Sequence, residues 1–291
     1  MMYLVRKLPS KILLNKVLSN HLNKILDVNL GNRGFHCGST FFAGHSKWAN
    51  IRHDKAKNDA KRSKQAAQMA FYITNSVRTH GIDGNPQLST LLDKAKKLNV
   101  TKKIIDNAVK RGTGEITSEV SLTQEVTYEF MGPGAVAIIV EANTDNKNRT
   151  IALVKHAMGQ FNALQSGCQY LFNKKGSVIL EPKDPLETLD DLLEVAIEVG
   201  AEDVEEYKDD EGEYSENTKL FRLFAEPNET NALSKELVNK GYKLKDISIG
   251  YFAQTESLVE FPEEHSKGFL KAIKELDEIA EVTNYYTNIQ D

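Results

Sequence analysis

The sequence is poor in cysteine and has no long apolar run. Only two of its 291 residues are cysteines, Cys37 and Cys168, so a network of disulfides is excluded, and no Cys/His spacing resembles a zinc site. No stretch approaches the roughly 18 apolar residues that a membrane-spanning helix needs, so no membrane span is expected. With 40% apolar and 27% charged residues, the composition is that of a globular chain long enough for two or three domains.

Acidic residues are scarce in the first 43 residues, which hold six Lys and Arg but only one acid, Asp27. Apolar residues recur there at roughly helical intervals. This basic, amphipathic composition is typical of a mitochondrial transit peptide and lacks the compact apolar core of a secretory signal; a disordered basic tail is the alternative. Residues 35–42 resemble a two-step mitochondrial processing signal, which predicts a mature terminus at Ala43 or Gly44.

Charge is divided unequally along the rest of the chain. Residues 44–115 contain 15 Lys and Arg against 6 Asp and Glu, a net charge of +9, whereas residues 116–291 contain 16 against 34, a net charge of −18. A module that concentrates positive charge is suited to a polyanion, because Lys and Arg that contact phosphates release condensed counterions. The alternative is a solvated helical surface.

The basic segment predicts three helices. From about Asp59 to His80, apolar residues follow the helical spacing of one buried stripe, formed by Ala66, Met69, Ala70, Ile73 and Val77. Lys57, Lys61 and Lys64 fall on the opposite side, where we expect a ridge of lysines without a packing role. Phe71 and Tyr72 lie nearer this ridge than the apolar stripe, and we expect them to contact the next domain; stacking on a nucleotide is the alternative.

The second helix is expected to begin with Asn85 as N-cap and Pro86 in the first turn. It should bury Leu88, Leu91, Leu92, Ala95 and Leu98 and expose Lys94, Lys96 and Lys97. Thr101 is expected to cap a third helix that Gly112 ends. That helix should bury Ile104, Ile105, Ala108 and Val109 and carry Lys110 and Arg111 in its last turn.

Beyond Glu115 the pattern changes to strands. Alternating apolar residues from Val126 to Phe130 and an apolar run ending at Val140 predict two strands joined by the turn Gly132-Pro133-Gly134. A helix and a strand then follow, over residues 148–161 and 169–173. Residues 177–251 show the β-α-β-β-α-β order of a ferredoxin-like unit. A last helix and a strand over residues 282–286 are expected to return to the earlier sheet.

The string Gly44-His45-Ser46-Lys47-Trp48, continued to Lys64, closely resembles the amino-terminal signature of the YebC/PmpR family. Further matches include Tyr128 to Gly134, Asn146-Lys147-Asn148-Arg149-Thr150, Tyr170 to Gly176 and Gly200 to Asp203. The resemblance implies an α+β fold of three domains around a cleft, in which an N-terminal helical bundle is followed by two α/β (ferredoxin-like) domains, the second inserted in the first. We therefore expect a transit peptide (1–43), a basic helical domain (44–118), an α/β domain (119–175 plus 253–291) and an inserted acidic ferredoxin-like domain (176–252).

The resemblance implies two functions. Mitochondrial members are translational activators linked to cytochrome c oxidase subunit I, and bacterial members have been described both as DNA-binding transcriptional regulators and as factors acting at the ribosome. The basic, acid-poor leader favours the function of the mitochondrial members, translational activation. The expected location is the mitochondrial matrix, and the expected partners of the monomer are the mitochondrial ribosome and its RNA, with mRNA and tRNA as further candidates; a DNA-binding regulator is the alternative.

The candidate RNA-binding residues combine the lysine ridge with the basic and aromatic residues of the family string: His45, Lys47, Trp48, Arg52, His53, Lys55, Lys57, Lys61, Arg62, Lys64, Lys110 and Arg111. Trp48, beside Lys47 and Arg52, is expected either to stack on a base or to anchor the preceding segment on the bundle. Gly132, Pro133 and Gly134 are predicted to form a rigid projecting loop that contacts a partner, because proline fixes φ and glycines permit close backbone approach.

An enzyme is the competing class. His45, Ser46 and His53 lie close in sequence, and hydrolases use Ser with His. However, the chain has no nucleophile elbow, no glycine-rich phosphate loop and no paired histidines at i, i+4. The acids of residues 202–211 indicate a solvated edge, and His156 is expected to be a packed helical residue. No catalytic residue, cofactor or metal is therefore expected.

Overall fold

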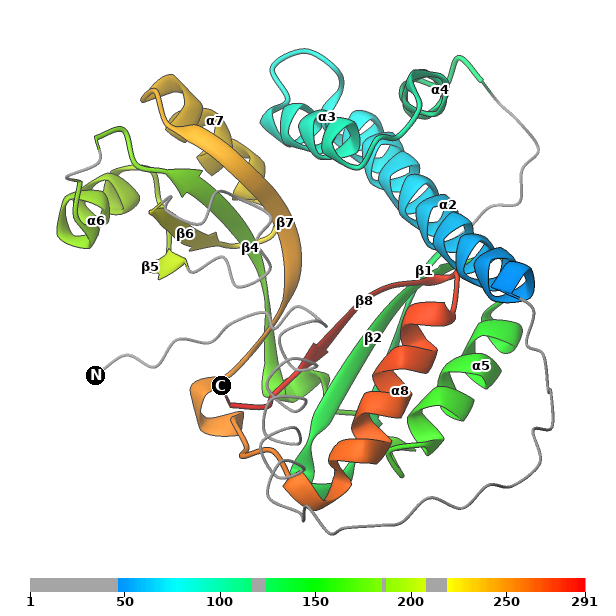
Figure 1. Cartoon of the computed structure of the whole chain (residues 1–291). Coiled ribbons are helices and arrows are strands. Elements are labelled where there is room, and N and C mark those ends of the chain that lie inside the picture. Colours follow the sequence, from blue (N-terminus) through cyan, green and yellow to red (C-terminus); the bar gives the residue numbers. More distant parts are fainter. Residues whose placement is uncertain (1–46, 117–123, 185–186, 208–218, 291) are drawn as a thin grey trace, which may run out of the picture.

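The computed structural model describes residues 47–116, 124–184, 187–207 and 219–290, with side chains from residue 58 onward. The leader lies outside these residues. In the part that is described, helices and two four-stranded antiparallel sheets form an α+β fold, as predicted (Figure 1). No helix within these ranges combines the length and the apolar character needed to cross a membrane.

Three helices form the N-terminal bundle: α2 (Lys47–His80), α3 (Pro86–Lys97) and α4 (Lys102–Gly112). Asn85 caps α3 as predicted, because its side-chain oxygen accepts a hydrogen bond from the Leu88 N–H at 3.0 Å. Thr101 is the N-cap of α4 but makes no side-chain cap bond. The shared core contains Ile73, Val77, Leu88, Leu91, Ala95 and Ala108. Leu98 was expected inside and is 41% exposed, because it follows the last turn of α3.

The first sheet has the order β3-β1-β2-β8. Its strands are β1 (Gln124–Met131), β2 (Ala137–Thr144), β3 (Leu164–Gln165) and β8 (Val282–Thr287). Helices α5 (Lys147–Gly159) and α8 (Ser266–Glu278) cover one face, where Phe130, Ile138, Phe161 and Phe269 lie in the largest core cluster. The C-terminal strand thus returns to the earlier sheet, as predicted. His156 on α5 was expected to be packed, but its side chain is 78% exposed.

The second sheet has the order β5-β6-β4-β7. Its strands are β4 (Phe172–Glu181), β5 (Asp203–Tyr207), β6 (Leu220–Ala225) and β7 (Lys243–Ala253), with helices α6 (Leu189–Glu198) and α7 (Thr230–Asn239) packed on one face. This is the predicted ferredoxin-like unit, inserted between elements of the first sheet. Residues 169–173 do not form a separate strand: Gln169–Leu171 is a short 3-10 helix, and β4 continues without a break from Phe172.

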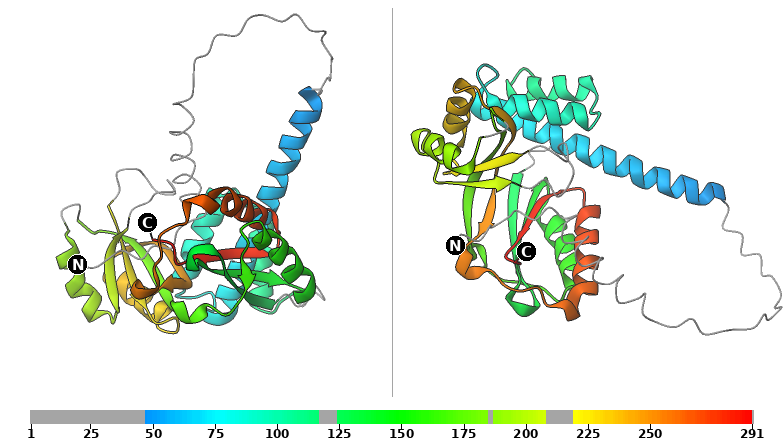
Figure 2. Two further views of the ribbon diagram at one scale, coloured as in Figure 1. Left: turned by 90° about the horizontal axis from the view of Figure 1, so that it is seen from below. Right: turned by 60° about the vertical axis from the view of Figure 1, so that its left-hand side comes forward.

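The three parts of the molecule touch one another. Ala137, Ile139 and Tyr286 of the first sheet share a core cluster with Phe172, Tyr251 and Ala253, which belong to the long strands β4 and β7. Helix α3 lies beside α7 and β7, and α2 runs across the ends of α5, α8 and the first sheet (Figures 1 and 2). The bundle is therefore seated on both α/β units, with the first turns of α2 extending away from them.

Candidate nucleic-acid interface

The face of α2 opposite its apolar stripe is an interdomain contact. The Gln68 side chain donates a hydrogen bond to the Val282 carbonyl at 3.0 Å, and Asn284 Nδ2 donates to the Tyr72 hydroxyl at 3.2 Å. Asn75 also donates to a Glu125 carboxylate oxygen at 3.3 Å. Tyr72 thus contacts the next domain, as expected. Its burial raises the pKa of the Tyr72 hydroxyl to about 12.

Lys64 belongs to this contact, so the prediction that it has no packing role is wrong. Its Nζ donates to the backbone carbonyl of Asp277 at 2.9 Å, in the last turn of α8. A cation at a helix C-terminus satisfies a free carbonyl and favours the helix dipole. Burial lowers the pKa of Lys64 and raises that of Asp277, each opposed by the charge of the other. Residue spacing alone did not reveal that a second domain covers this side of the helix.

Lys61 and Arg62 are exposed, one turn before Lys64. Lys110 and Arg111 are also exposed, in the last turn of α4. That turn packs on α2 near Thr74 and Val77, where a Cβ on Gly112 would come within 2.6 Å of Val77 Cβ. Thirteen residues of helix separate Lys61 from Thr74, which is about 20 Å at 1.5 Å per residue. The predicted basic residues therefore form two groups along the bundle.

The remaining predicted RNA-binding residues cannot be placed at the level of side chains. Lys47, Trp48, Arg52, His53, Lys55 and Lys57 lie in the first turns of α2, where only the backbone is described, and His45 lies outside the described residues. Their roles stay predictions, including the two alternatives for Trp48.

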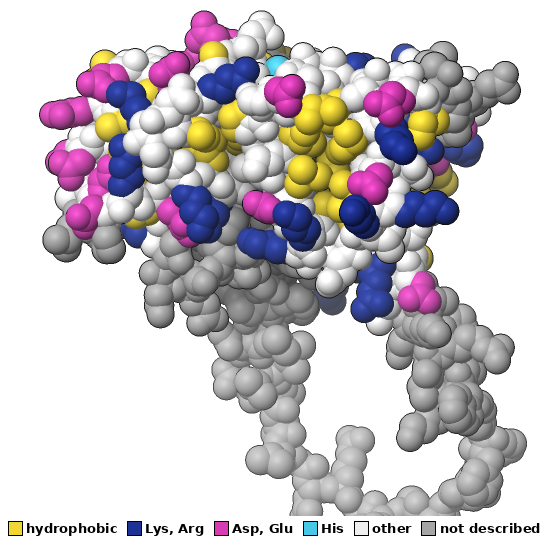
Figure 3. Space-filling model, turned by 90° about the horizontal axis from the view of Figure 1, so that it is seen from above, with side chains coloured by type: hydrophobic (Ala, Val, Ile, Leu, Met, Phe, Trp, Pro, Cys, Tyr) yellow, Lys and Arg dark blue, Asp and Glu magenta, His cyan; other side chains and the backbone are white. Residues whose placement is uncertain are grey.

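Four lysines that the candidate set omitted are exposed around the α3–α4 connection: Lys96, Lys97, Lys102 and Lys103. The last two occupy the first turn of α4, where positive charge opposes the helix dipole. Helix stability therefore does not explain the presence of Lys102 and Lys103. Their position at a helix start could have been recognised from the sequence and would have added them to the candidate set. Seen from above the bundle, apolar side chains gather in the middle of the face, and Lys and Arg lie around them together with several Asp and Glu (Figure 3).

The bundle is also tied to the inserted unit. Lys94, which was expected to be exposed, is half-buried and pairs with Asp246 of β7 at 2.6 Å. At the end of α2, Asn231 Nδ2 of α7 lies 3.1 Å from His80 Nδ1. Burial and the charge of Lys235 lower the pKa of His80. These contacts set the orientation of the exposed basic face relative to the acidic domains.

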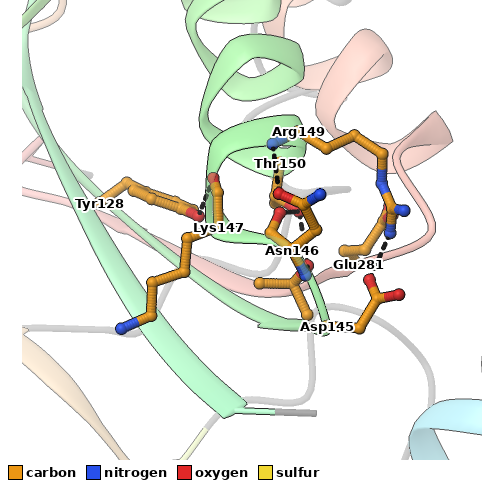
Figure 4. Close-up of polar contacts among 8 residues, drawn as sticks. Tyr128, Asp145, Asn146, Lys147, Arg149, Thr150 and Glu281 are labelled. Atoms are coloured by element: carbon orange, nitrogen blue, oxygen red, sulfur yellow. Dashed lines mark hydrogen bonds and ion pairs between the residues drawn. The ribbon is translucent and has the colours of Figure 1, made fainter. Parts of the chain in front are cut away.

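The Asn146 to Thr150 motif fastens α5 to the start of β8 (Figure 4). Asn146 caps the helix by accepting from the Arg149 N–H at 3.1 Å. The Arg149 guanidinium bridges Asp145 at 2.6 Å and Glu281 at 2.9 Å, and these two carboxylates raise its pKa. The Lys147 amine points away from this cluster (Figure 4). The motif is thus explained mainly by local structure.

The Gly132-Pro133-Gly134 turn makes internal contacts that the sequence did not predict. A Cβ on Gly132 would lie 2.3 Å from Cε1 of the buried Phe161 ring, and a Cβ on Gly134 would lie 3.1 Å from Pro262. Gly134 also has a φ of 70°, in the left-handed region that favours glycine. Both glycines therefore have internal explanations. Contact of the turn with a partner stays a prediction.

The described part of the bundle offers exposed cations as its main chemical feature. In the described ranges, no group of three or more His, Cys, Asp or Glu side chains is placed to hold a metal ion. Cys168 is buried, and burial raises its pKa. The exposed lysines and arginines can attract an anionic surface through charge and hydrogen bonds.

Comparison with known proteins identifies the family. Residues 46–115 match the model of the TACO1/YebC protein N-terminal domain, and residues 123–289 match the model of the TACO1/YebC second and third domain. The chain belongs to the TACO1/YebC family.

Relatives of this family span nearly the whole chain. A probable transcriptional regulatory protein of Saccharomyces cerevisiae, HAH1, is 37% identical over 86% of this chain and 91% of its own. A probable transcriptional regulatory protein of Persephonella marina is 40% identical, over 85% of this chain and 96% of its own length. A crystal structure of a conserved hypothetical protein from Aquifex aeolicus matches with a TM-score of 0.60 and 31% identity, covering 84% of this chain and 96% of that one.

Proposed function

We propose that this protein is a mitochondrial translational activator that binds the phosphates of ribosomal RNA through its basic helical domain. The observation that carries the proposal is the separation of charge, with +9 on residues 44–115 and −18 on residues 116–291. Counterion release favours binding of the basic part to a polyanion, and the acidic part repels the same polyanion. Nucleic acid should therefore approach the bundle and avoid the acidic α/β domains.

The structure supports a definite set of contacts for this role. Lys61 and Arg62 project beyond the point where Lys64 joins α8, and Lys102 and Lys103 sit where their charge opposes the α4 dipole. Within the described ranges no hydrogen bond or ion pair holds these four side chains, and the attraction between Lys61 and Asp277 is the electrostatic contact that one of them makes. Binding by charge and shape suits structured RNA, whose deep major groove excludes side chains.

The proposed location rests on the leader. Six basic residues, one acid and helical apolar spacing in residues 1–43 are typical of import into mitochondria. A chain delivered there could meet the RNA of the mitochondrial ribosome.

A DNA-binding transcriptional regulator is the second candidate, and the names of the relatives favour it. Base reading normally requires Arg, Asn and Gln clustered on one recognition helix. The exposed turns of α3 and α4 present mainly lysines, which suit phosphate contact better. The two candidates share the basic surface and differ in the nucleic acid bound.

Ribosome co-sedimentation over a salt series tests the first candidate. We expect Lys61→Glu/Arg62→Glu and Lys102→Glu/Lys103→Glu each to release the protein at lower salt, and to reduce the salt slope by about 1 for each residue that meets a phosphate. The second variant places acids at a helix N-terminus, so α4 should not be destabilised. Lys271→Glu/Lys274→Glu, on exposed positions of α8, gives the same change of net charge as a control.

Release of all three variants at the same salt would mean that net charge alone determines ribosome binding, and it would contradict a defined interface.

Crosslinking and sequencing of bound nucleic acid from isolated mitochondria separates the two candidates. Ribosomal RNA is the expected product, whereas enrichment of mitochondrial DNA would favour the regulator.

A further inference from the structure

Helix α6 of the inserted unit carries an apolar ridge on its outer side. Leu189, Leu193 and Ile197 follow one another at i, i+4 and i+8, so they line one side of the helix. Their exposed fractions are 38%, 46% and 71%. The core of this unit is filled by other residues of the same helix, Leu192 and Ala196. The exposed part of the ridge, largest at Ile197, is therefore apolar surface that the core of this unit leaves uncovered.

The helix does not need the ridge for its own stability. Thr188 and Asp191 form a capping box at its start, with hydrogen bonds in both directions between side chain and backbone. Buried Leu192 and Ala196 hold it on the sheet. Substitution of exposed ridge residues should therefore leave the fold intact.

The ridge is bordered by negative charge. Asp190 precedes Leu193 by three residues, and Glu194 precedes Ile197 by three, so both acids flank the ridge on the helix surface. The ten residues of α6 include four acids and no base. Within the described part of the chain, Asp190 and Glu194 form no ion pair. Several Asp and Glu, with some Lys and Arg among them, also lie at the left end of the molecule in Figure 3.

We propose that this α6 ridge is a docking site for a basic amphipathic segment of another protein. A partner helix with one apolar stripe would cover Leu189, Leu193 and Ile197, and its flanking Lys or Arg would pair with Asp190 and Glu194. Nucleic acid is excluded as the occupant because its phosphates would face these carboxylates. The ridge spans about 12 Å along the helix, which matches two turns of a partner.

This inference is independent of the proposed RNA contact, which lies on a different domain. The basic bundle would bind RNA, and α6 would bind a basic segment of another protein. The chain would then bridge two components of one assembly. Loss of either contact alone should leave the other measurable.

The test uses the full-length chain and a synthetic amphipathic peptide of leucine and lysine, with fluorescence anisotropy as the readout. We expect Leu193→Ser/Ile197→Ser to weaken binding at least about tenfold, since apolar contact area is removed. Asp190→Asn/Glu194→Gln should weaken binding at low salt and have less effect at high salt. Unchanged melting curves establish that both variants are folded.

Leu153→Ser provides the matched control. Leu153 is 44% exposed on α5, close to the 46% of Leu193, but its neighbours at helical spacing are Arg149 and His156. This variant should bind the peptide like the wild type. A peptide with glutamate in place of lysine should bind weakly.

Three results would overturn the proposal. Equal binding of the lysine peptide and the glutamate peptide would show that charge complementarity plays no part. Unchanged binding by Leu193→Ser/Ile197→Ser would show that the peptide binds elsewhere. A wild-type dimer in sedimentation that this variant abolishes would instead make the ridge a contact between copies of the chain.

Discussion

Replacing Gly132 by alanine should destabilise the protein. The residue has a φ of −103°, which alanine adopts without strain, but the new Cβ would lie 2.3 Å from Phe161 Cε1 and 2.8 Å from Cδ1. Carbon atoms normally approach to about 3.5–4.0 Å. The Phe161 ring is 1% exposed and packs on Phe269 at 5.0 Å between ring centres. The ring cannot easily move away because of this packing. The backbone of Gly132 cannot easily move either, because its N–H bonds to the Val136 carbonyl at 2.7 Å.

Overpacking of this kind costs about 1–3 kcal/mol, which corresponds to a fall of roughly 4–24 °C in the melting temperature of a domain of 60–100 residues. Differential scanning calorimetry measures the shift. Gly159→Ala is the control, since a Cβ there meets nothing within 4 Å, and it should be neutral or stabilising by up to about 1 kcal/mol. A smaller ring neighbour, Phe161→Leu, should recover part of the loss in the Gly132→Ala background. If Gly132→Ala melted like the wild type yet lost ribosome binding, the glycine would serve a partner and the internal explanation would be wrong.

The other predictions concern how the bundle is attached. Lys64→Ala should lower stability by about 1 kcal/mol, as expected for one lost hydrogen bond, while Lys61→Ala should melt like the wild type; equal melting of both variants would mean that the α8 contact contributes nothing. Lys94→Met should loosen the contact of α3 with β7 and so increase amide hydrogen exchange in α3, measured by mass spectrometry. An unchanged exchange rate would mean that the pair with Asp246 does not hold the bundle in place. Because the pKa of His80 is lowered from 6.5, the folded state binds this proton less readily than the unfolded state, so stability should decrease as pH falls below 6.5 toward the lower pKa of the folded state. Melting curves between pH 7.5 and 5 should fall more steeply for the wild type than for His80→Gln, and parallel curves would exclude this titration.

Local rules predicted the elements well because their signals lie close together in sequence. Asn85 and Pro86 mark the start of α3 through a cap bond and a fixed φ. Alternation of Tyr128 and Phe130 placed both side chains in the core cluster of the first sheet. The β-α-β-β-α-β order likewise follows from successive short patterns, and the resemblance to a family added the insertion of one unit in the other.

The contacts between domains could not be predicted in the same way. Gln68, Tyr72 and Asn75 meet the next domain through hydrogen bonds to groups far away in sequence, and polar residues at helical spacing look like a solvated face. Gly132 shows the same limit, since the ring that requires a glycine is Phe161, just after the end of α5. Sequence spacing identified the basic residues, but only the fold separates Lys64, which is used internally, from Lys61.

The position of Lys64 also gives a physical reason for the length of α2. This helix has 34 residues, and its described contacts with the first sheet and α8 run from Lys64 to Asn75. The preceding 17 residues extend over roughly 25 Å at 1.5 Å per residue, away from the α/β domains (Figure 2). Because the Debye length at physiological salt is about 8 Å, repulsion between the acidic domains and a polyanion at the far end of this segment would be largely screened. Lys61 and Arg62 lie only about 3–5 Å along the helix from Lys64, which contacts α8, so this screening does not extend to them. A projecting helix is therefore compatible with the proposed RNA contact on a chain with a strongly acidic body, and the salt series should accordingly report the lysines of the bundle more than the acids behind them.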